Sequence, residues 1–318
     1  MTELGSHVPV MIEEVLSALS PQSGEVYVDA TFGAGGYTKA ILDAADCTVI
    51  AIDRDIHARQ IATRLQEEYG DRLVFVHGKF SDINEILHGL DLRSVDGLVL
   101  DIGVSSMQLD QAERGFSFQK DGPLDMRMDA SAGQSAADLV AHSREEDLAR
   151  IIYEYGEERY SRRIAKAIAR HRQDEEIATT SMLADIVRAA VPGKPKPGVD
   201  KATKTFQALR IAVNDELEEL SEVLEASRSV MNEGGRLVVV SFHSLEDRIV
   251  KQFLKRYSGE KIGVSRHMPD VEPESDAEFE LLSRKALTPG AEEIKRNPRA
   301  RSAKLRAARR VSDGGGGE

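Results

Sequence analysis

The sequence has little of what would place a protein in a membrane or outside the cell. Its 318 residues include a single cysteine, Cys47, so no intramolecular disulfide can form. The longest apolar runs, such as residues 237–240, fall far short of the roughly 20 residues that cross a bilayer. The N-terminus lacks the basic and then apolar pattern of a signal peptide. We therefore expect a soluble, cytoplasmic protein.

Positive charge is also in deficit. Lys and Arg total 42 against 54 Asp and Glu, which argues against a protein that coats nucleic acid with its whole surface. Eight basic residues nevertheless lie between positions 295 and 310 with no acidic residue among them. A basic segment on an acidic chain indicates a polyanionic partner met locally, and the alternative is a solvated helix end or tail. The eight are Lys295, Arg296, Arg299, Arg301, Lys304, Arg306, Arg309 and Arg310.

Short apolar strands alternate with helical patterns over the first hundred residues. This order predicts an α/β fold with a mostly parallel sheet built from βαβ units. The expected strands are residues 26–30, 48–53, 73–77, 97–101 and 236–242. The last of them follows the fourth by about 130 residues, which is far too long for one crossover. The sequence therefore predicts an inserted subdomain.

The insertion is expected to be mainly helical. Part of the gap is a crossover helix, because apolar residues recur there at spacings of three and four. The stripe consists of Leu209, Val213, Leu217, Leu220 and Leu224. We thus assign residues 1–109 and 205–318 to the core and residues 110–204 to the insertion.

A glycine-rich turn follows the first strand at residues 29–37 (DATFGAGGY) and opens a helix. Such a turn lets a ligand approach the backbone and frees helix-end N–H groups. Asp53 follows Gly33 by 20 residues at the end of the second strand, where an acidic side chain commonly binds ribose hydroxyls. Together these features indicate an adenosine-containing ligand, although alone the turn could be structural and the aspartate a helix cap.

Charge favours S-adenosylmethionine over a dinucleotide. The dinucleotide pattern has a third glycine or alanine where this chain has Thr38, and Asp29 would repel a pyrophosphate. The ammonium and sulfonium of S-adenosylmethionine instead suit an acidic edge. A nucleotide-dependent oxidoreductase is the less favoured alternative.

Two further strand ends carry groups suited to chemistry. Residues 101–110 (DIGVSSMQLD) project a carboxylate, hydroxyls and an amide, and residues 241–244 add His243. Ends of parallel strands commonly hold reacting groups at one edge of the sheet. The alternatives are that Asp101 and the serines cap the next segment and that His243 is structural.

These residues and several longer motifs resemble the MraW, or RsmH, family of bacterial methyltransferases. The likeness runs from His7 to about Arg306. The motifs are residues 31–36 (TFGAGG), 101–110, 113–118 (ERGFSF), 122–128 (GPLDMRM), 155–159 (YGEER), 205–210 (TFQALR), 241–248 (SFHSLEDR) and 297–302 (NPRARS).

The resemblance implies a class I methyltransferase fold that uses S-adenosylmethionine and no metal. It implies transfer to N4 of a cytidine in the decoding centre of 16S ribosomal RNA, within the small ribosomal subunit or its late precursor. Tyr37 stands where many relatives have His, so its contact is expected through the backbone. The residues implied to bind the donor are Gly35, Gly36, Tyr37, Asp53, Phe80, Asp101 and Gln108.

Asp101 is our candidate for the group that accepts a hydrogen bond from the target amine. Cys47 lies at the start of the second strand, away from the strand ends, so no thiol is placed for attack on C5 of the base. A non-catalytic RNA-binding assembly factor remains a further alternative. Besides the 295–310 segment, two groups of basic residues could contact phosphate, one in a loop and one on a helix. The alternative for the helix group is an ordinary solvated surface. The two groups are the loop lysines Lys194, Lys196, Lys201 and Lys204, and the helix face of Arg159, Arg162, Arg163, Lys166 and Arg170.

Overall fold

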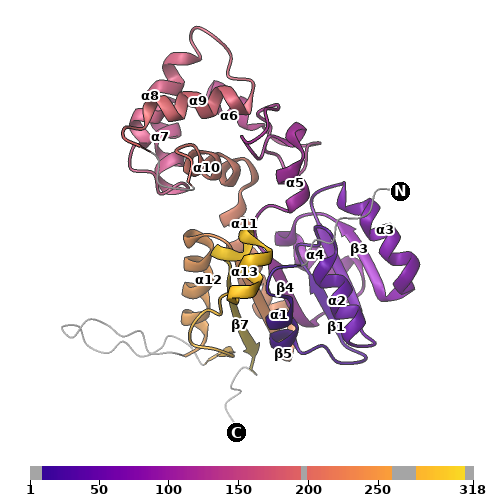
Figure 1. The fold of residues 1–318 in the computed structure, drawn as a ribbon. Coiled ribbons are helices and arrows are strands. Elements are labelled where there is room, and N and C mark those ends of the chain that lie inside the picture. Colours follow the sequence, from indigo (N-terminus) through magenta and orange to yellow (C-terminus); the bar gives the residue numbers. More distant parts are fainter. Residues whose placement is uncertain (1–8, 195–198, 260–276, 312–318) are drawn as a thin grey trace, which may run out of the picture. The chain divides into compact units, whose positions relative to one another are not determined.

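The computed structural model describes residues 9–194, 199–259 and 277–311. The chain divides into two compact units. The first combines residues up to Gly103 with those from Leu217 onward, and the second spans Val104–Glu216. The sheet belongs to the first unit, whereas the described residues of the second are mainly helical (Figure 1).

The first unit is built on a seven-stranded sheet of order β3-β2-β1-β4-β5-β7-β6. The first five strands are parallel, and β7 is antiparallel to both β5 and β6. This confirms the predicted α/β class with a mostly parallel sheet. The strands are β1 (Val26–Asp29), β2 (Thr48–Asp53), β3 (Leu73–His77), β4 (Val95–Asp101), β5 (Met231–Ser241), β6 (Phe279–Leu281) and β7 (Lys304–Arg310).

Both faces of the sheet are buried. Alternate residues of a strand point to opposite faces, so Val49 and Ala51 of β2 enter one apolar cluster while Ile50 and Ile52 enter the other. A strand buried on both faces reads as a continuous apolar run, which is why these strands were predictable. Helices α1 (Ile12–Leu19), α2 (Gly36–Ala44) and α3 (Ala58–Tyr69) pack in the first cluster, and α4 (Ile83–Gly89), α11 (Glu216–Val230) and α12 (Ser244–Tyr257) in the second.

The predicted basic segment at residues 295–310 contributes one strand to this sheet. Its residues form α13 (Ala291–Arg296), a short 3-10 helix (Pro298–Ser302) and β7. Leu305, Ala307 and Ala308 of β7 are buried, and Leu305 and Ala308 enter opposite faces of the sheet. The sequence predicts no strand in this segment, because its many charges hide an alternation of apolar residues.

Carboxylates neutralise much of β7. Lys304 Nζ and Arg306 Nε each lie 2.8 Å from the carboxylate of Asp247. Arg309 pairs with Glu280 at 2.5 Å, and Arg310 pairs with Glu278 at 3.5 Å. These four charges serve the fold and do not form an open basic surface.

The second unit has its own apolar core. Leu148, Ile152, Ile164, Leu183 and Leu209 are among its fully buried residues. Its helices are α5 (Ser106–Asp110), α6 (Ala136–His142), α7 (Glu145–Glu154), α8 (Ser161–His171), α9 (Thr180–Ala190) and α10 (Thr203–Asn214).

The predicted crossover helix is in fact two helices. Asp215 adopts a left-handed conformation, with φ of 51°, and separates α10 from α11. Leu209 then packs in the core of the second unit, whereas Leu220 packs against the sheet. Residues 104–109 and 205–216, which we had placed in the core domain, thus belong to the second compact unit. Regular apolar spacing across Asp215 conceals this break.

Candidate active site

The ends of β1 and β4 mark the point where strand order reverses. Strand β2 lies on one side of β1 and β4 lies on the other. Open parallel sheets bind ligands outside the carboxyl ends of strands at such a switch point. Asp29 ends β1 and Asp101 ends β4, with Asp53 at the end of β2. The sheet topology therefore places three predicted carboxylates at the edge where a ligand is expected.

Asp29 is completely buried and binds the turn that follows it. Its carboxylate accepts hydrogen bonds from the backbone N–H of Thr38 at 3.1 Å and from the Thr38 hydroxyl at 2.7 Å. It also accepts one from the N–H of Thr31 at 3.2 Å. Burial raises the pKa of Asp29 to about 6 despite these bonds. Its visible role is to hold the start of α2.

Asp53 connects the glycine-rich turn to the end of β2. Its Oδ2 accepts a hydrogen bond from Gly33 N–H, and its Oδ1 accepts one from Asp55 N–H, both at 2.7 Å. Burial raises the pKa of Asp53 to about 6. A carboxylate oxygen can accept two hydrogen bonds. Asp53 therefore keeps acceptor capacity for a ligand hydroxyl while it holds the turn.

Close packing of neighbouring side chains explains why positions 35 and 36 of the turn are glycine. A Cβ added at Gly35 would lie 2.6 Å from Leu65 Cδ1, and Gly35 also has a positive φ of 76°. A Cβ at Gly36 would lie 2.2 Å from Pro9 Cγ. Protein side chains thus already fill the space beside both positions.

Tyr37 is turned toward the N-terminal segment. Its side chain is buried, and its hydroxyl donates a hydrogen bond to Val10 O at 2.5 Å. Burial raises the pKa of Tyr37 well above its ordinary value. The side chain is engaged by the protein, which leaves the backbone of this position for any ligand contact.

Asp101 differs from the other two carboxylates. Its Oδ1 is buried, and within the residues that the structure describes it has no hydrogen-bond partner. Its backbone N–H donates to Thr31 Oγ1 at 2.6 Å. Burial, followed by the charges of Asp29 and Glu246, raises the pKa of Asp101 to about 8. A buried unpaired oxygen beside other acids fits a cationic ligand, because a positive charge would satisfy it.

Glu246 is a residue that the sequence analysis missed. It is fully buried at the start of α12, and its Oε2 accepts hydrogen bonds from Phe242 N–H at 2.8 Å and His243 N–H at 3.1 Å. His243 Nδ1 accepts from Glu246 N–H at 3.4 Å, and Nε2 lies 2.8 Å from Glu246 Oε1. The Nδ1 atom of His243 is therefore used at the helix start, whereas Nε2 is buried and has no hydrogen-bond partner within the described residues.

The two remaining predicted donor-binding residues lie elsewhere in the chain. Phe80 begins a 3-10 helix after β3 and packs on the sheet cluster. Gln108 is in the second unit, where its side chain accepts from Ser105 N–H at 3.0 Å in a capping box. The site residues of the first unit are coupled electrostatically through Asp29, which lies within range of both Asp53 and Asp101.

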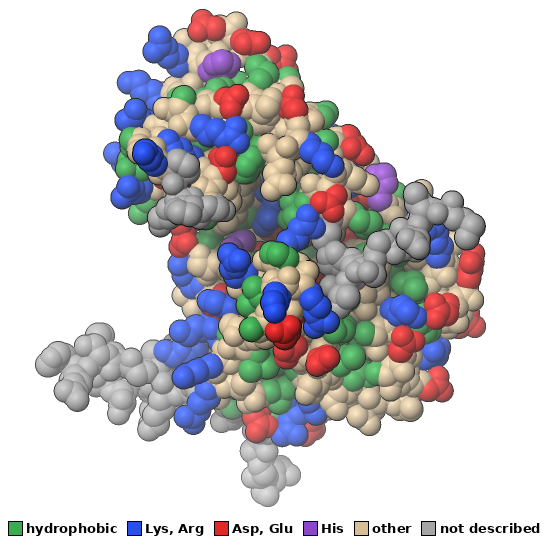
Figure 2. Space-filling view, viewed as in Figure 1, with side chains coloured by type: hydrophobic (Ala, Val, Ile, Leu, Met, Phe, Trp, Pro, Cys, Tyr) green, Lys and Arg blue, Asp and Glu red, His purple; other side chains and the backbone are tan. Residues whose placement is uncertain are grey.

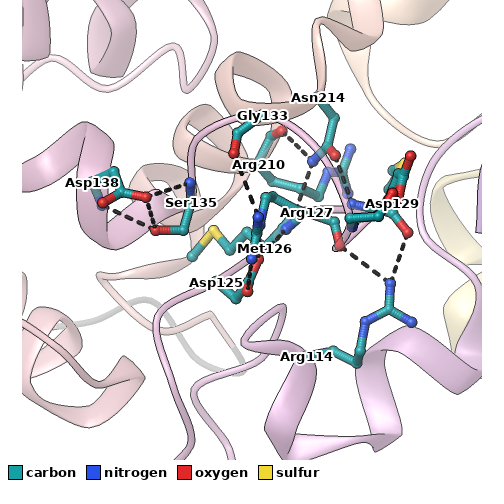
Figure 3. Close-up of polar contacts among 12 residues, drawn as sticks. Arg114, Asp125, Met126, Arg127, Asp129, Gly133, Ser135, Asp138, Arg210 and Asn214 are labelled. Carbon is teal, nitrogen blue, oxygen red and sulfur yellow. Dashed lines mark hydrogen bonds and ion pairs between the residues drawn. The ribbon is translucent and has the colours of Figure 1, made fainter.

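A buried clamp orders the motif at residues 122–128 in the second unit (Figure 3). Asn214 Nδ2 donates to Met126 O at 2.7 Å, and its Oδ1 accepts from Met128 N–H at 2.8 Å. Met126 is buried with φ of 62°, a strained conformation for a residue with a side chain. Arg114 adds a bond to Met128 O at 2.9 Å. A polar Asn214 at the end of an apolar helical stripe was the signal available in the sequence.

The sequence profile of the MraW methylase family matches residues 5–311. The chain belongs to this family. A protein called ribosomal RNA small subunit methyltransferase H from Paramagnetospirillum magneticum is 54% identical over 307 residues, which cover 96% of each chain. The protein of that name from Maricaulis maris is 56% identical over 303 residues, covering 95% of this chain and 90% of the other.

Within the described residues, no group of three or more His, Cys, Asp or Glu side chains could hold a metal ion. No helix in the same part of the chain is long and apolar enough to cross a membrane.

Proposed function

We propose that this MraW methylase transfers the methyl group of S-adenosylmethionine to N4 of a specific cytidine in the decoding centre of 16S ribosomal RNA. Family membership supports methylation of small-subunit ribosomal RNA. The small subunit or its late precursor would be the natural substrate. The structural observation that carries the site assignment is the buried, unpaired Oδ1 of Asp101 at the switch point.

The site residues would hold the donor by charge and hydrogen bonds. When bound, S-adenosylmethionine supplies an already activated methyl group, so the protein has mainly to align the reactants and exclude water. Asp101 would accept from the donor's ammonium, and Asp53 would accept from its ribose hydroxyls. The backbone at Gly35, Gly36 and Tyr37 would line the turn, with Phe80 and Gln108 completing the set. Asp29 and Glu246 would hold these groups in place.

The acceptor presents the chemical difficulty. The lone pair of the cytosine amine is delocalised into the ring, so an oxygen that accepts its N–H helps to localise that pair. Asp101 is our candidate for this second role as well. The base must also leave its stack to reach the sheet edge, which costs a few kcal/mol. We assign recognition of the RNA around it to the second unit.

The position of Cys47 favours nitrogen over carbon methylation. C5 methylation of cytosine usually needs a thiol that attacks the ring. Cys47 is buried just before β2, and burial raises the pKa of its thiol. Asp53 ends the same strand, roughly 20 Å away at about 3.3 Å per residue. The cysteine therefore lies at the N-terminal end of the strand, whereas the proposed site is at the C-terminal ends of the strands.

Product analysis tests this function. The protein is incubated with labelled S-adenosylmethionine and undermethylated small subunits, and the RNA is digested to nucleosides. We expect label in N4-methylcytidine from a single position. Label in 5-methylcytidine would overturn the assignment. RNA binding without any transfer would favour an assembly factor, and binding of a nicotinamide dinucleotide would favour the oxidoreductase.

A further inference from the structure

Helix α8 has two opposite faces. Ile164, Ala165 and Ile168 are completely buried in the core of the second unit. Four exposed basic side chains occupy the other side, within an arc of about 100° at 3.6 residues per turn. We call them the α8 basic face, and they are Arg162, Arg163, Lys166 and Arg170. Lys and Arg side chains gather on the side of this unit where Figure 1 places α8 (Figure 2).

The α8 basic face has no carboxylate partner in the described part of the chain. No Asp or Glu occurs from Arg159 through Gln173, and none of the four cations lies in an ion pair. Several other arginines of the unit are paired with carboxylates. Arg144 lies 2.8 Å from Asp147, and Arg188 lies 2.8 Å from Asp185. The α8 basic face thus concentrates four unpaired cations on one helix of a chain with a net charge of −12.

Arg170, in the last turn of α8, is placed favourably for the helix dipole, but the other three cations of the face are not. Arg162 and Arg163 are in the first turn of α8, where the helix dipole disfavours positive charge, and this turn has no acidic residue. Helix α7 shows the opposite pattern, with Glu145, Glu146 and Asp147 in its first turn. Like charges at i and i+4, such as Arg162 and Lys166, also repel each other. Arg162, Arg163 and Lys166 therefore lower the stability of the helix when no partner is bound.

Many cations of the other two predicted basic segments are used within the protein, although Lys194 and Arg301 are exposed and lie in none of the ion pairs of the described residues. Four of the cations of β7 pair with carboxylates, as described above. Lys201 Nζ donates to Val191 O at 2.7 Å, and Lys204 Nζ donates to Glu157 O at 2.6 Å. Lys196 lies outside the described residues. Arg159 is stacked on Tyr160 and hydrogen-bonded to its hydroxyl.

We infer that the α8 basic face binds the phosphate backbone of the ribosomal RNA substrate. This inference rests on the proposed function for the identity of the RNA. Phosphate contacts release condensed counterions and position an RNA without reading its sequence. The face spans nine residues, or about 12 Å of helix, which permits several contacts at once. It supplies affinity for the subunit and takes no part in donor binding.

A matched pair of variants tests the interface. The test variant carries Arg162→Gln and Lys166→Gln, and the control carries Arg144→Gln and Arg150→Gln on α7. Each pair removes two exposed cations from one helix of the second unit, but the control residues are ion-paired with Asp147. Binding to undermethylated small subunits is measured over a series of salt concentrations, and donor binding is measured by calorimetry.

We expect the test variant to bind subunits roughly tenfold or more weakly at about 0.1 M salt. Its log–log salt slope should be shallower by roughly 1.4–1.8, because each lost phosphate contact contributes about 0.7–0.9. The control should keep the wild-type slope, and both variants should bind the donor normally. An unchanged slope in the test variant, or an equal loss in the control, overturns the interface.

Product analysis of the same samples separates the two proposals. Wild-type protein that makes N4-methylcytidine while the test variant binds subunits normally would refute the interface alone. If the test variant loses affinity for subunits and has a shallower salt slope, but the wild-type protein makes no N4-methylcytidine, the interface is supported and the proposed reaction is refuted.

Discussion

Asp101 combines burial, like charge and an unpaired oxygen in one side chain. Its pKa of about 8 means that the ligand-free protein holds it mostly protonated at pH 7. A bound ammonium is satisfied by the ionised form, so binding must release a proton. The protonation state of this one residue therefore connects donor affinity to pH.

We expect donor affinity to rise up to tenfold per pH unit between about pH 6 and pH 8 and then to level off. Asp53 and Asp29, with pKa values of about 6, are half ionised at pH 6 and largely ionised above about pH 7, so they contribute to the slope only at the lower end of this range. In Asp101→Asn, affinity should be lower and nearly independent of pH. Calorimetry at several pH values measures both effects, and equal pH dependence in the two proteins would remove Asp101 from the site.

Stability of the ligand-free Asp101→Asn variant provides the control. A carboxyl with a pKa raised from 3.8 to about 8 destabilises the folded state increasingly as pH rises between those values. The variant should therefore unfold at a higher temperature than wild type at pH 8. That advantage should shrink as the pH falls toward 4. A variant that binds poorly because it is misfolded would show the opposite.

Asp53 has both a structural and a binding role. Asp53→Ala removes two backbone hydrogen bonds together with the proposed ribose contact. We expect donor affinity to fall by about 1.5–3 kcal/mol, and the free energy of unfolding to fall by about 1–3 kcal/mol. Calorimetry and thermal unfolding measure the two losses. A folded Asp53→Ala protein with wild-type donor affinity would contradict the assignment.

Among the secondary-structure elements, β7 matters most for the integrity of the sheet. It pairs with β5 along six residues and with β6 along three, so it completes the sheet from within. We expect a chain ending at Ile294 to lose donor binding together with the cooperative unfolding of the first unit. A chain ending at Val311 should keep both. Near-ultraviolet circular dichroism and donor calorimetry test this, and native donor affinity in the shorter chain would show that β7 is dispensable.

Some elements were predictable because one signal dominated them. Strands β1 to β4 are short apolar runs that end at acidic or glycine-rich turns, and Asp53 and Asp101 lie at those ends as expected. The sequence signal of β7 was weaker, because Lys304 and Arg306 alternate with the buried residues. Only the structure shows Asp247 neutralising both. The break at Asp215 likewise depends on one backbone conformation that leaves apolar spacing intact.

For the whole molecule, the sequence indicated two units but not how each polar group is used. Acidic residues at strand ends were predicted as a group, yet Asp29 binds its own turn while Asp101 keeps an unpaired oxygen. Composition likewise identified three basic segments. Which of them is neutralised depends on partners far away in sequence, such as Asp247 for β7. Hydrogen-bond and ion-pair partners of this kind are set by tertiary packing.

The position of β7 also affects the order in which the protein is made. Val104–Glu216 is one continuous stretch, so all of it is synthesised before β5. Strand β5 lies between β4 and β7, and β7 begins only at Lys304. At about 5–20 residues per second, β7 is therefore synthesised several seconds after β5. During that interval a growing chain displays β5 as an open strand edge, the kind of surface that invites aggregation. The helical unit can therefore fold on the ribosome well before the catalytic sheet is complete.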